Sequence, residues 1–131
     1  MLATVLKVKI FVTLIFWSLP LLFCPSSWFV RMGSPEPKPM LFLRLFGAAS
    51  LGLVVAYTSG IRRLGRGDDV RHIVWVGITS NGLSSLILLR SGIAGVWKEW
   101  GPLARIYMWG SALATAAITL GLGAGLLRGD R

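Results

Sequence analysis

Two long stretches without a charged side chain dominate the second half of this sequence. Residues 73–89 carry no charge over 17 positions, and residues 106–127 carry none over 22. A helix of about 20 apolar residues spans the hydrocarbon core of a bilayer, which is about 30 Å thick. Backbone polar groups inside that core need partners within the protein, and a helix supplies them along its own length. The two stretches therefore predict membrane-spanning helices.

The composition of the whole chain agrees with a membrane protein. Of its 131 residues, 54% are hydrophobic, and the mean hydropathy is +0.69. The surface helices of a soluble domain keep a polar face, whereas these long stretches carry no charged side chain at all. The 14 Lys and Arg residues against 5 acidic residues give a net charge of +9. They lie at the ends of apolar stretches, where they meet lipid headgroups, so we expect membrane lipids and no nucleic acid as partners.

This pattern predicts an all-α integral membrane bundle of four helices in two hairpins, forming a single domain. A proline-rich linker at 31–39 joins the first two helices, because alternating prolines favour extended backbone. A basic central loop at 61–71 joins the two hairpins. The helices are expected at about 6–23, 40–60, 72–89 and 103–127.

The first helix permits a second interpretation. Lys7 and Lys9 followed by the apolar stretch 10–23 also describe a secretory signal peptide. Cleavage requires small residues before the cut, whereas bulky Phe23 precedes Cys24. We therefore expect an uncleaved helix.

A proline lies inside this first helix. Pro20 has no backbone N–H, so the carbonyl of Phe16 loses its helical donor, and we expect a kink.

Basic residues near the helix ends indicate the orientation in the membrane. With the N-terminus inside, eight lie on the cytoplasmic side and six on the other, and the density of the central loop favours both termini in the cytoplasm. The eight are Lys7, Lys9, Arg62, Arg63, Arg66, Arg71, Arg128 and Arg131, and the six are Arg31, Lys38, Arg44, Arg90, Lys98 and Arg105.

Small residues recur every fourth position in two of the helices. Such stripes let helix backbones approach closely in a membrane. They motivate the leading hypothesis of a non-enzymatic membrane component that packs with itself or with another membrane protein. The second helix carries Ala48, Gly52, Ala56 and Gly60, and the fourth carries Ala117, Gly121 and Gly125.

Polar side chains in the third helix share one face. Asn81, Ser84 and Ser85 should point into the bundle, where they form interhelical hydrogen bonds or line a cavity for a substrate.

Three arginines fall at one membrane interface in the expected topology. Arg44, Arg90 and Arg105 either hold a lipid phosphate or serve as ordinary anchors of helix ends. Together with the Asn81 face they suggest a second hypothesis, a binder or carrier of a lipid, a quinone or another hydrophobic small molecule.

The sequence gives little support to chemistry that needs ionisable groups in the bilayer core. No Asp, Glu, Lys or His falls in the middle of an expected span, so we predict no catalytic residue, no metal site and no cofactor.

Asp68, Asp69 and His72 could touch a divalent ion, but a loop that caps the following helix explains them better. Cys24, the single cysteine, is expected to be inert rather than a nucleophile or a palmitoylation site. A membrane enzyme acting on a hydrophobic substrate is kept as the third hypothesis.

Two short segments carry a family resemblance. They are Arg44-Leu-Phe-Gly47, at the start of the second helix, and Ile73-Val-Trp-Val-Gly77, which opens the third. In this layout the chain resembles small four-helix membrane proteins of bacteria such as the DoxX-like and BphX-like families. The resemblance covers under half of the chain and implies a multi-pass protein of the bacterial inner membrane. It carries no functional residue over to this sequence.

Overall fold

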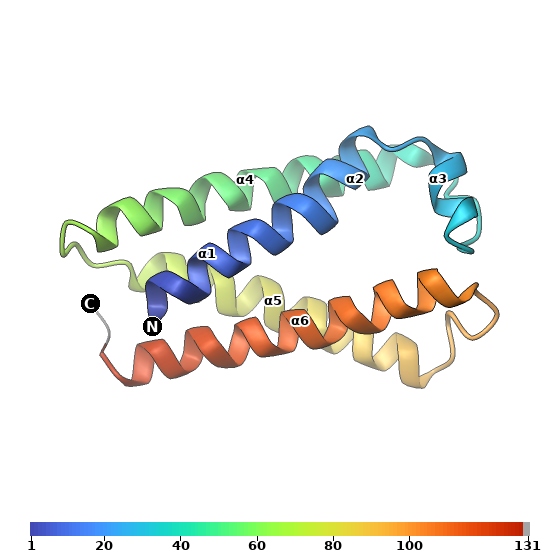
Figure 1. Cartoon of the computed structure of the whole chain (residues 1–131). Helices are drawn as coiled ribbons and strands as arrows, with labels where there is room; N and C mark the ends of the chain where they lie inside the picture. Colours follow the sequence, from blue (N-terminus) through green and yellow to red (C-terminus); the bar gives the residue numbers. More distant parts are fainter. Residues whose placement is uncertain (130–131) are drawn as a thin grey trace.

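Four helices in a computed structural model of the chain are long and apolar enough to cross a membrane (Figure 1). The structure describes residues 1–129, so Arg131 of the charge count lies outside the described part. The first span, Leu2–Phe23, consists of α1, the π-helix η1 and α2. The elements are α1 (Leu2–Val12), η1 (Thr13–Ser18), α2 (Leu19–Phe23), α3 (Ser26–Arg31), α4 (Met40–Leu64), α5 (Arg71–Ile93) and α6 (Pro102–Leu127).

The helices extend further than the expected ranges. The first span begins at Leu2 rather than near residue 6. Lys7 and Lys9 therefore lie well inside it rather than close to its start. Helix α4 continues through Arg62 and Arg63, which lie in its last turn. Cations are favourable there because the helix dipole places partial negative charge at the C-terminal end. Basic residues therefore mark the membrane boundary of this helix without ending it.

The proline of the first span is accommodated by a local change of helix type. Pro20 follows the π-helix η1 and occupies the first turn of α2, where a missing N–H is tolerated. The Tyr107 hydroxyl of α6 donates a hydrogen bond to the Phe16 carbonyl. This is the carbonyl that the proline deprives of its usual donor, so α6 supplies the replacement.

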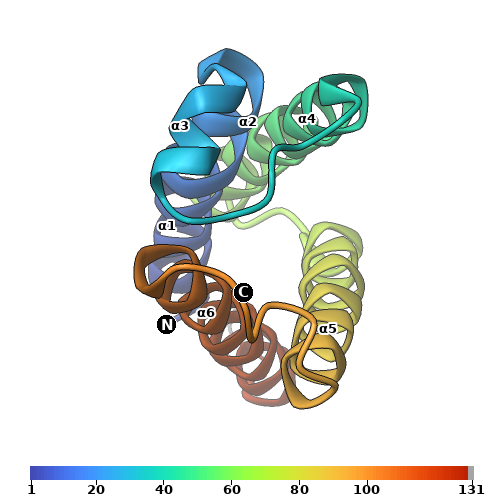
Figure 2. The same cartoon turned by 90° about the vertical axis from the view of Figure 1, so that its right-hand side faces the viewer.

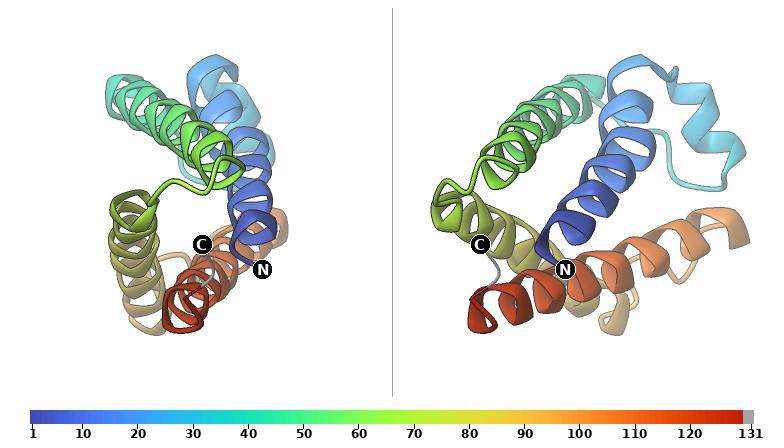
Figure 3. Two further views of the ribbon diagram at one scale, coloured as in Figure 1. Left: turned by 90° about the vertical axis from the view of Figure 1, so that its left-hand side faces the viewer. Right: turned by 60° about the vertical axis from the view of Figure 1, so that its left-hand side comes forward.

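The four spans alternate in direction, and α5 packs against α6 along most of its length (Figures 1 and 2). Helix α1 packs against both α4 and α6, whereas α4 and α5 make few contacts and diverge away from the loop that joins them (Figure 3). Because α1 bridges the two halves, the arrangement in two hairpins stays a prediction. The buried apolar cluster lies near the N-terminus and contains Leu2, Leu6, Tyr57, Val70, Ile73, Val74, Ile118 and Leu122.

A close contact between two glycines joins the halves at the opposite end. The Gly101 amide donates to the Gly33 carbonyl at 2.8 Å, and the Ala104 amide donates to the Met32 carbonyl at 2.9 Å. The second bond satisfies one of the amides that a helix N-terminus leaves without an internal acceptor. Figure 2 shows the linker after α3 passing over the start of α6. We call this contact the glycine junction.

Candidate ligand-binding site

Two adjoining clefts open between the first span, α3 and α6. The rim cleft, near the glycine junction, has a volume of about 560 Å³. The deep cleft has the same volume of about 560 Å³ and reaches Gly110 and Ala114 of α6. Ala114 lies twelve residues after Pro102, which corresponds to about 18 Å of helix and places it near the middle of α6. The clefts share a wall made of Trp17, Trp28, Met32 and Tyr107.

Aromatic side chains organise this shared wall. Trp17 of η1 packs edge-on against Phe46 of α4, with ring centroids 5.7 Å apart, and lies 5.7 Å from the ring of Tyr107. Trp28 and Phe29 of α3 form a second edge-on pair at 5.2 Å. The wall thus draws on the first span, α3 and α6, and Phe46 of α4 packs against it.

Polarity falls from the rim cleft to the deep cleft. The linker contributes Ser34, Glu36 and Lys38 to the rim cleft. The Lys38 ammonium forms an ion pair with Glu36 at 2.8 Å, and this hydrogen-bonded contact raises the pKa of Lys38. In the deep cleft, Ser111 is the polar residue among mainly apolar and small side chains.

The alternative in which three arginines hold one lipid headgroup finds no support in the structure. The Arg44 guanidinium donates to the carbonyls of Leu21 and Cys24, at 2.8 Å each. These carbonyls lie at the end of α2, where helical donors run out, so Arg44 caps a helix end. Arg90 and Arg105 are exposed on α5 and α6. None of the three lines either cleft.

The polar face of α5 points inward, as expected, but it contacts helices rather than a cavity. Asn81 and Ser85 are buried, and Ser85 donates to the Ala112 carbonyl of α6 at 3.4 Å. Ser84 is partly buried and donates to the Ser80 carbonyl within its own helix. Neither cleft includes any of these residues, so the proposal that this face lines a substrate cavity finds no support.

A buried lysine is the main polar feature that the sequence reading missed. Lys9 is only 6% exposed, and its ammonium donates to the Asn81 side-chain oxygen at 2.6 Å. It also lies 5.4 Å from the ring centre of Tyr57. We expected no lysine in the middle of a span; Lys9 lies in the N-terminal half of the span Leu2–Phe23, with its ammonium buried against other helices. Lys9 lies near the start of the chain, so the sequence suggested a residue that flanks the first span. Its partner, Asn81, is 72 residues away, and no pattern near Lys9 in the sequence indicates this pairing.

The small-residue stripes divide between internal and external surfaces. Added Cβ atoms at Gly121 and Gly125 would lie 3.3 Å from Val5 and 3.1 Å from Leu2, so these glycines admit α1 against α6. Gly60 similarly faces Ile73 at 3.0 Å. The rest of the chain covers Ala56 only in part and leaves Ala48, Gly52 and Ala117 exposed.

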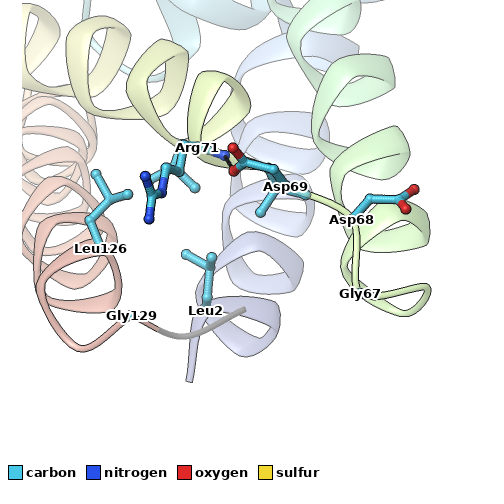
Figure 4. A pocket seen from close by; sticks show the side chains of 9 residues that line it. Leu2, Gly67, Asp68, Asp69, Arg71, Leu126 and Gly129 are labelled. Atoms are coloured by element: carbon cyan, nitrogen blue, oxygen red, sulfur yellow. Dashed lines mark hydrogen bonds between the residues drawn. The ribbon is translucent and has the colours of Figure 1, made fainter.

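The central loop contributes a third cavity, of about 340 Å³, near the N-terminus (Figure 4). The Asp69 carboxylate accepts the Arg71 amide at 2.9 Å, which caps α5 from the position before its N-cap, Val70. Asp68 instead approaches Arg66 at 3.4 Å, and Figure 4 shows its carboxylate directed away from Asp69. Across residues 1–129, no three His, Cys, Asp or Glu side chains gather as a metal site. Cys24 is partly buried at the end of α2.

Comparisons with known proteins identify no relative of this chain. No family model, curated protein or solved structure matches the chain. The resemblance to DoxX-like and BphX-like proteins therefore stays a prediction, and the site has to be interpreted from its own geometry.

Proposed function

We propose that this multi-pass membrane protein binds an amphiphilic lipid in the rim and deep clefts. The observation that carries the proposal is the pair of joined clefts, which runs from a charged rim toward the bilayer centre. Each cleft has a volume of about 560 Å³, within the range of about 300–1,000 Å³ that small-molecule sites occupy.

The order of polarity along the clefts matches that of a lipid. Glu36 and Lys38 lie at the rim, at the depth expected for a headgroup. Gly110 and Ala114 leave an apolar channel at the depth of an acyl chain. A bound chain would bury apolar surface against Trp17 and Tyr107, which line both clefts.

Self-association through α4 is the second candidate. An added Cβ at Gly52 would meet nothing within 4 Å, and Ala48, one turn earlier, is exposed. This surface has room for a close helix from a second copy. It ranks second because the other stripe glycines, Gly60, Gly121 and Gly125, already serve contacts within the chain.

We also propose a location in the bacterial inner membrane with both termini in the cytoplasm. The starting point of α1, the central loop and the end of α6 lie at one end of the molecule (Figure 1). That end carries the densest group of basic residues, 62–71, which supports the orientation.

One pair of matched variants tests the two candidate functions. Gly110→Leu and Gly52→Leu both place a side chain in open space, because no atom lies within 4 Å of either added Cβ. Gly110 lines the deep cleft, whereas Gly52 lies on the exposed face of α4. Native mass spectrometry of the purified proteins reports both the subunit stoichiometry and the lipids that stay bound.

Lipid binding predicts that Gly110→Leu loses the bound lipid while Gly52→Leu keeps it. Self-association predicts instead that Gly52→Leu lowers the oligomer fraction and that Gly110→Leu leaves it unchanged. Equal lipid retention by the wild type and Gly110→Leu would contradict the lipid-binding proposal.

A further inference from the structure

The rim cleft has an unusually aromatic lining. Five separate segments of the chain contribute rings to it, from η1 to α6. Such rings offer negatively polarised faces that attract cations, and methylated ammonium groups are the ligands most often held this way. The lining rings belong to Trp17, Trp28, Phe29, Phe42, Phe46, Trp100 and Tyr107.

The two side-chain hydroxyls of this lining already donate hydrogen bonds to backbone carbonyls. The Ser34 hydroxyl donates to the carbonyl of Phe29 at 2.9 Å, and the Tyr107 hydroxyl donates to Phe16. A primary ammonium brings three N–H donors, and each would need an acceptor when it leaves water. A quaternary ammonium has no N–H donor, so an aromatic cleft with few free acceptors suits it better.

The rim also presents one positive and one negative side chain side by side. Lys38 and Glu36 are 76% and 46% exposed, so an arriving headgroup can reach both charges. A headgroup with a single charge would be attracted by one of them and repelled by the other. A headgroup with both charges can oppose each with its complement.

We propose that the rim cleft selects a zwitterionic phospholipid with a phosphocholine headgroup. The phosphate lies at Lys38, the methylated ammonium lies against Glu36 and the Trp28 and Phe29 rings, and an acyl chain enters the deep cleft. This inference rests on the proposed lipid-binding function, because it names the lipid that the same clefts take.

A competition between three lipids with identical dioleoyl chains tests the inference. The detergent-purified protein is mixed with equimolar dioleoyl phosphatidylcholine, phosphatidylethanolamine and phosphatidylglycerol, and retained lipids are read by native mass spectrometry. We expect phosphatidylcholine to be retained about tenfold more than phosphatidylglycerol, with phosphatidylethanolamine between them. The Gly110→Leu variant should retain none of the three.

Two variants of the rim and two matched controls locate the preference. Glu36→Gln and Trp28→Leu should reduce the ratio of phosphatidylcholine to phosphatidylglycerol to about twofold or less. Glu99→Gln and Trp75→Leu change the same residue types at exposed positions outside the clefts and should leave the ratio unchanged. The linker position of Glu36 lies outside every helix, so its change to Gln preserves the fold.

The outcomes separate the two proposals. Equal retention of all three lipids by the wild type, with none by Gly110→Leu, would overturn the headgroup selectivity and leave the lipid-binding function standing. A preference that survives both rim variants would overturn the assignment of the headgroup to the rim cleft. Retention of no lipid above the level of Gly110→Leu would overturn both.

Discussion

Lys9 shows what a single side chain decides in this protein. Its ammonium lies among α1, α4 and α5, bonded to Asn81 and close to the Tyr57 ring. Asn81 in turn donates to the Gly77 carbonyl at 2.6 Å. A cation buried among apolar helices is expensive unless a polar group receives it. Asn81 therefore gives α1 one favoured position against α5.

The pairing predicts a dependence between Lys9 and Asn81. Asn81→Leu should lower the free energy of unfolding by about 1–3 kcal/mol, because it leaves the buried ammonium without its acceptor. Lys9→Met in that background should restore part of the loss, since both members of the pair are then apolar. Unfolding of the detergent-solubilised wild type, single and double variants measures the coupling. Additive losses would show that the two side chains do not interact.

At the scale of the element, the first span depends on a helix that lies beside it. Pro20 has no backbone N–H to donate to the Phe16 carbonyl, and the segment before it, η1, is a π-helix. The Tyr107 hydroxyl of α6 donates a hydrogen bond to that carbonyl instead. The irregular segment therefore lies against α6 at the shared wall of the two clefts. The same contact keeps Tyr107 in that wall.

Restoring the missing donor should make the tyrosine hydroxyl dispensable. Tyr107→Phe should lower the free energy of unfolding by about 1 kcal/mol, the usual value of one interhelical hydrogen bond. In a Pro20→Ala background, residue 20 has its own N–H, and the loss should shrink. Thermal unfolding of the four proteins measures both effects. The same loss in both backgrounds would argue against this role of the hydroxyl.

At the scale of the whole molecule, contacts at two ends enclose the clefts. The buried apolar cluster holds α1, α4, α5 and α6 together near the N-terminus. The glycine junction holds α3 and the linker against the start of α6 at the other end. Between these two contacts, small residues such as Gly110 and Ala114 leave the space that the deep cleft occupies.

The glycine junction yields a prediction with an internal control. Gly33 has a φ of +91°, and an added Cβ would lie 2.5 Å from the Gly101 Cα. Gly67 has a φ of +77°, but nothing lies within 4 Å of its Cβ position. Alanine at either position should cost about 1 kcal/mol through backbone conformation. Only Gly33→Ala should also separate the linker from α6 and lower lipid retention in native mass spectrometry.

Retention of lipid at the wild-type level by Gly33→Ala would show that the junction does not shape the rim cleft. A parallel loss in Gly67→Ala would point to global destabilisation instead. The free energy of unfolding, measured for both variants, separates these two cases.

Much of the architecture could be predicted because it depends on local properties of the chain. The stretches at 73–89 and 106–127 are long, apolar and without charge, and a segment of that kind can span a bilayer only with its backbone paired internally, as in a helix. Pro20 has no N–H in any fold, so its effect on the Phe16 carbonyl was also predictable. These features identified an all-α chain with four helices able to span a membrane.

The candidate site depends on contacts that no local pattern encodes. Lys9 is buried because Asn81 and Tyr57 meet it from other helices. Arg44 was expected at a headgroup, but its guanidinium donates to backbone carbonyls at the end of α2. Gly121 serves α1 while Gly52 faces outward, although both belong to the same kind of stripe. The sequence by itself determined which segments are long and apolar enough to span a membrane, since this depends on the length and hydrophobicity of each segment. Only the tertiary structure decided which of their faces meet and where space remains, because both depend on how residues distant in the chain pack together.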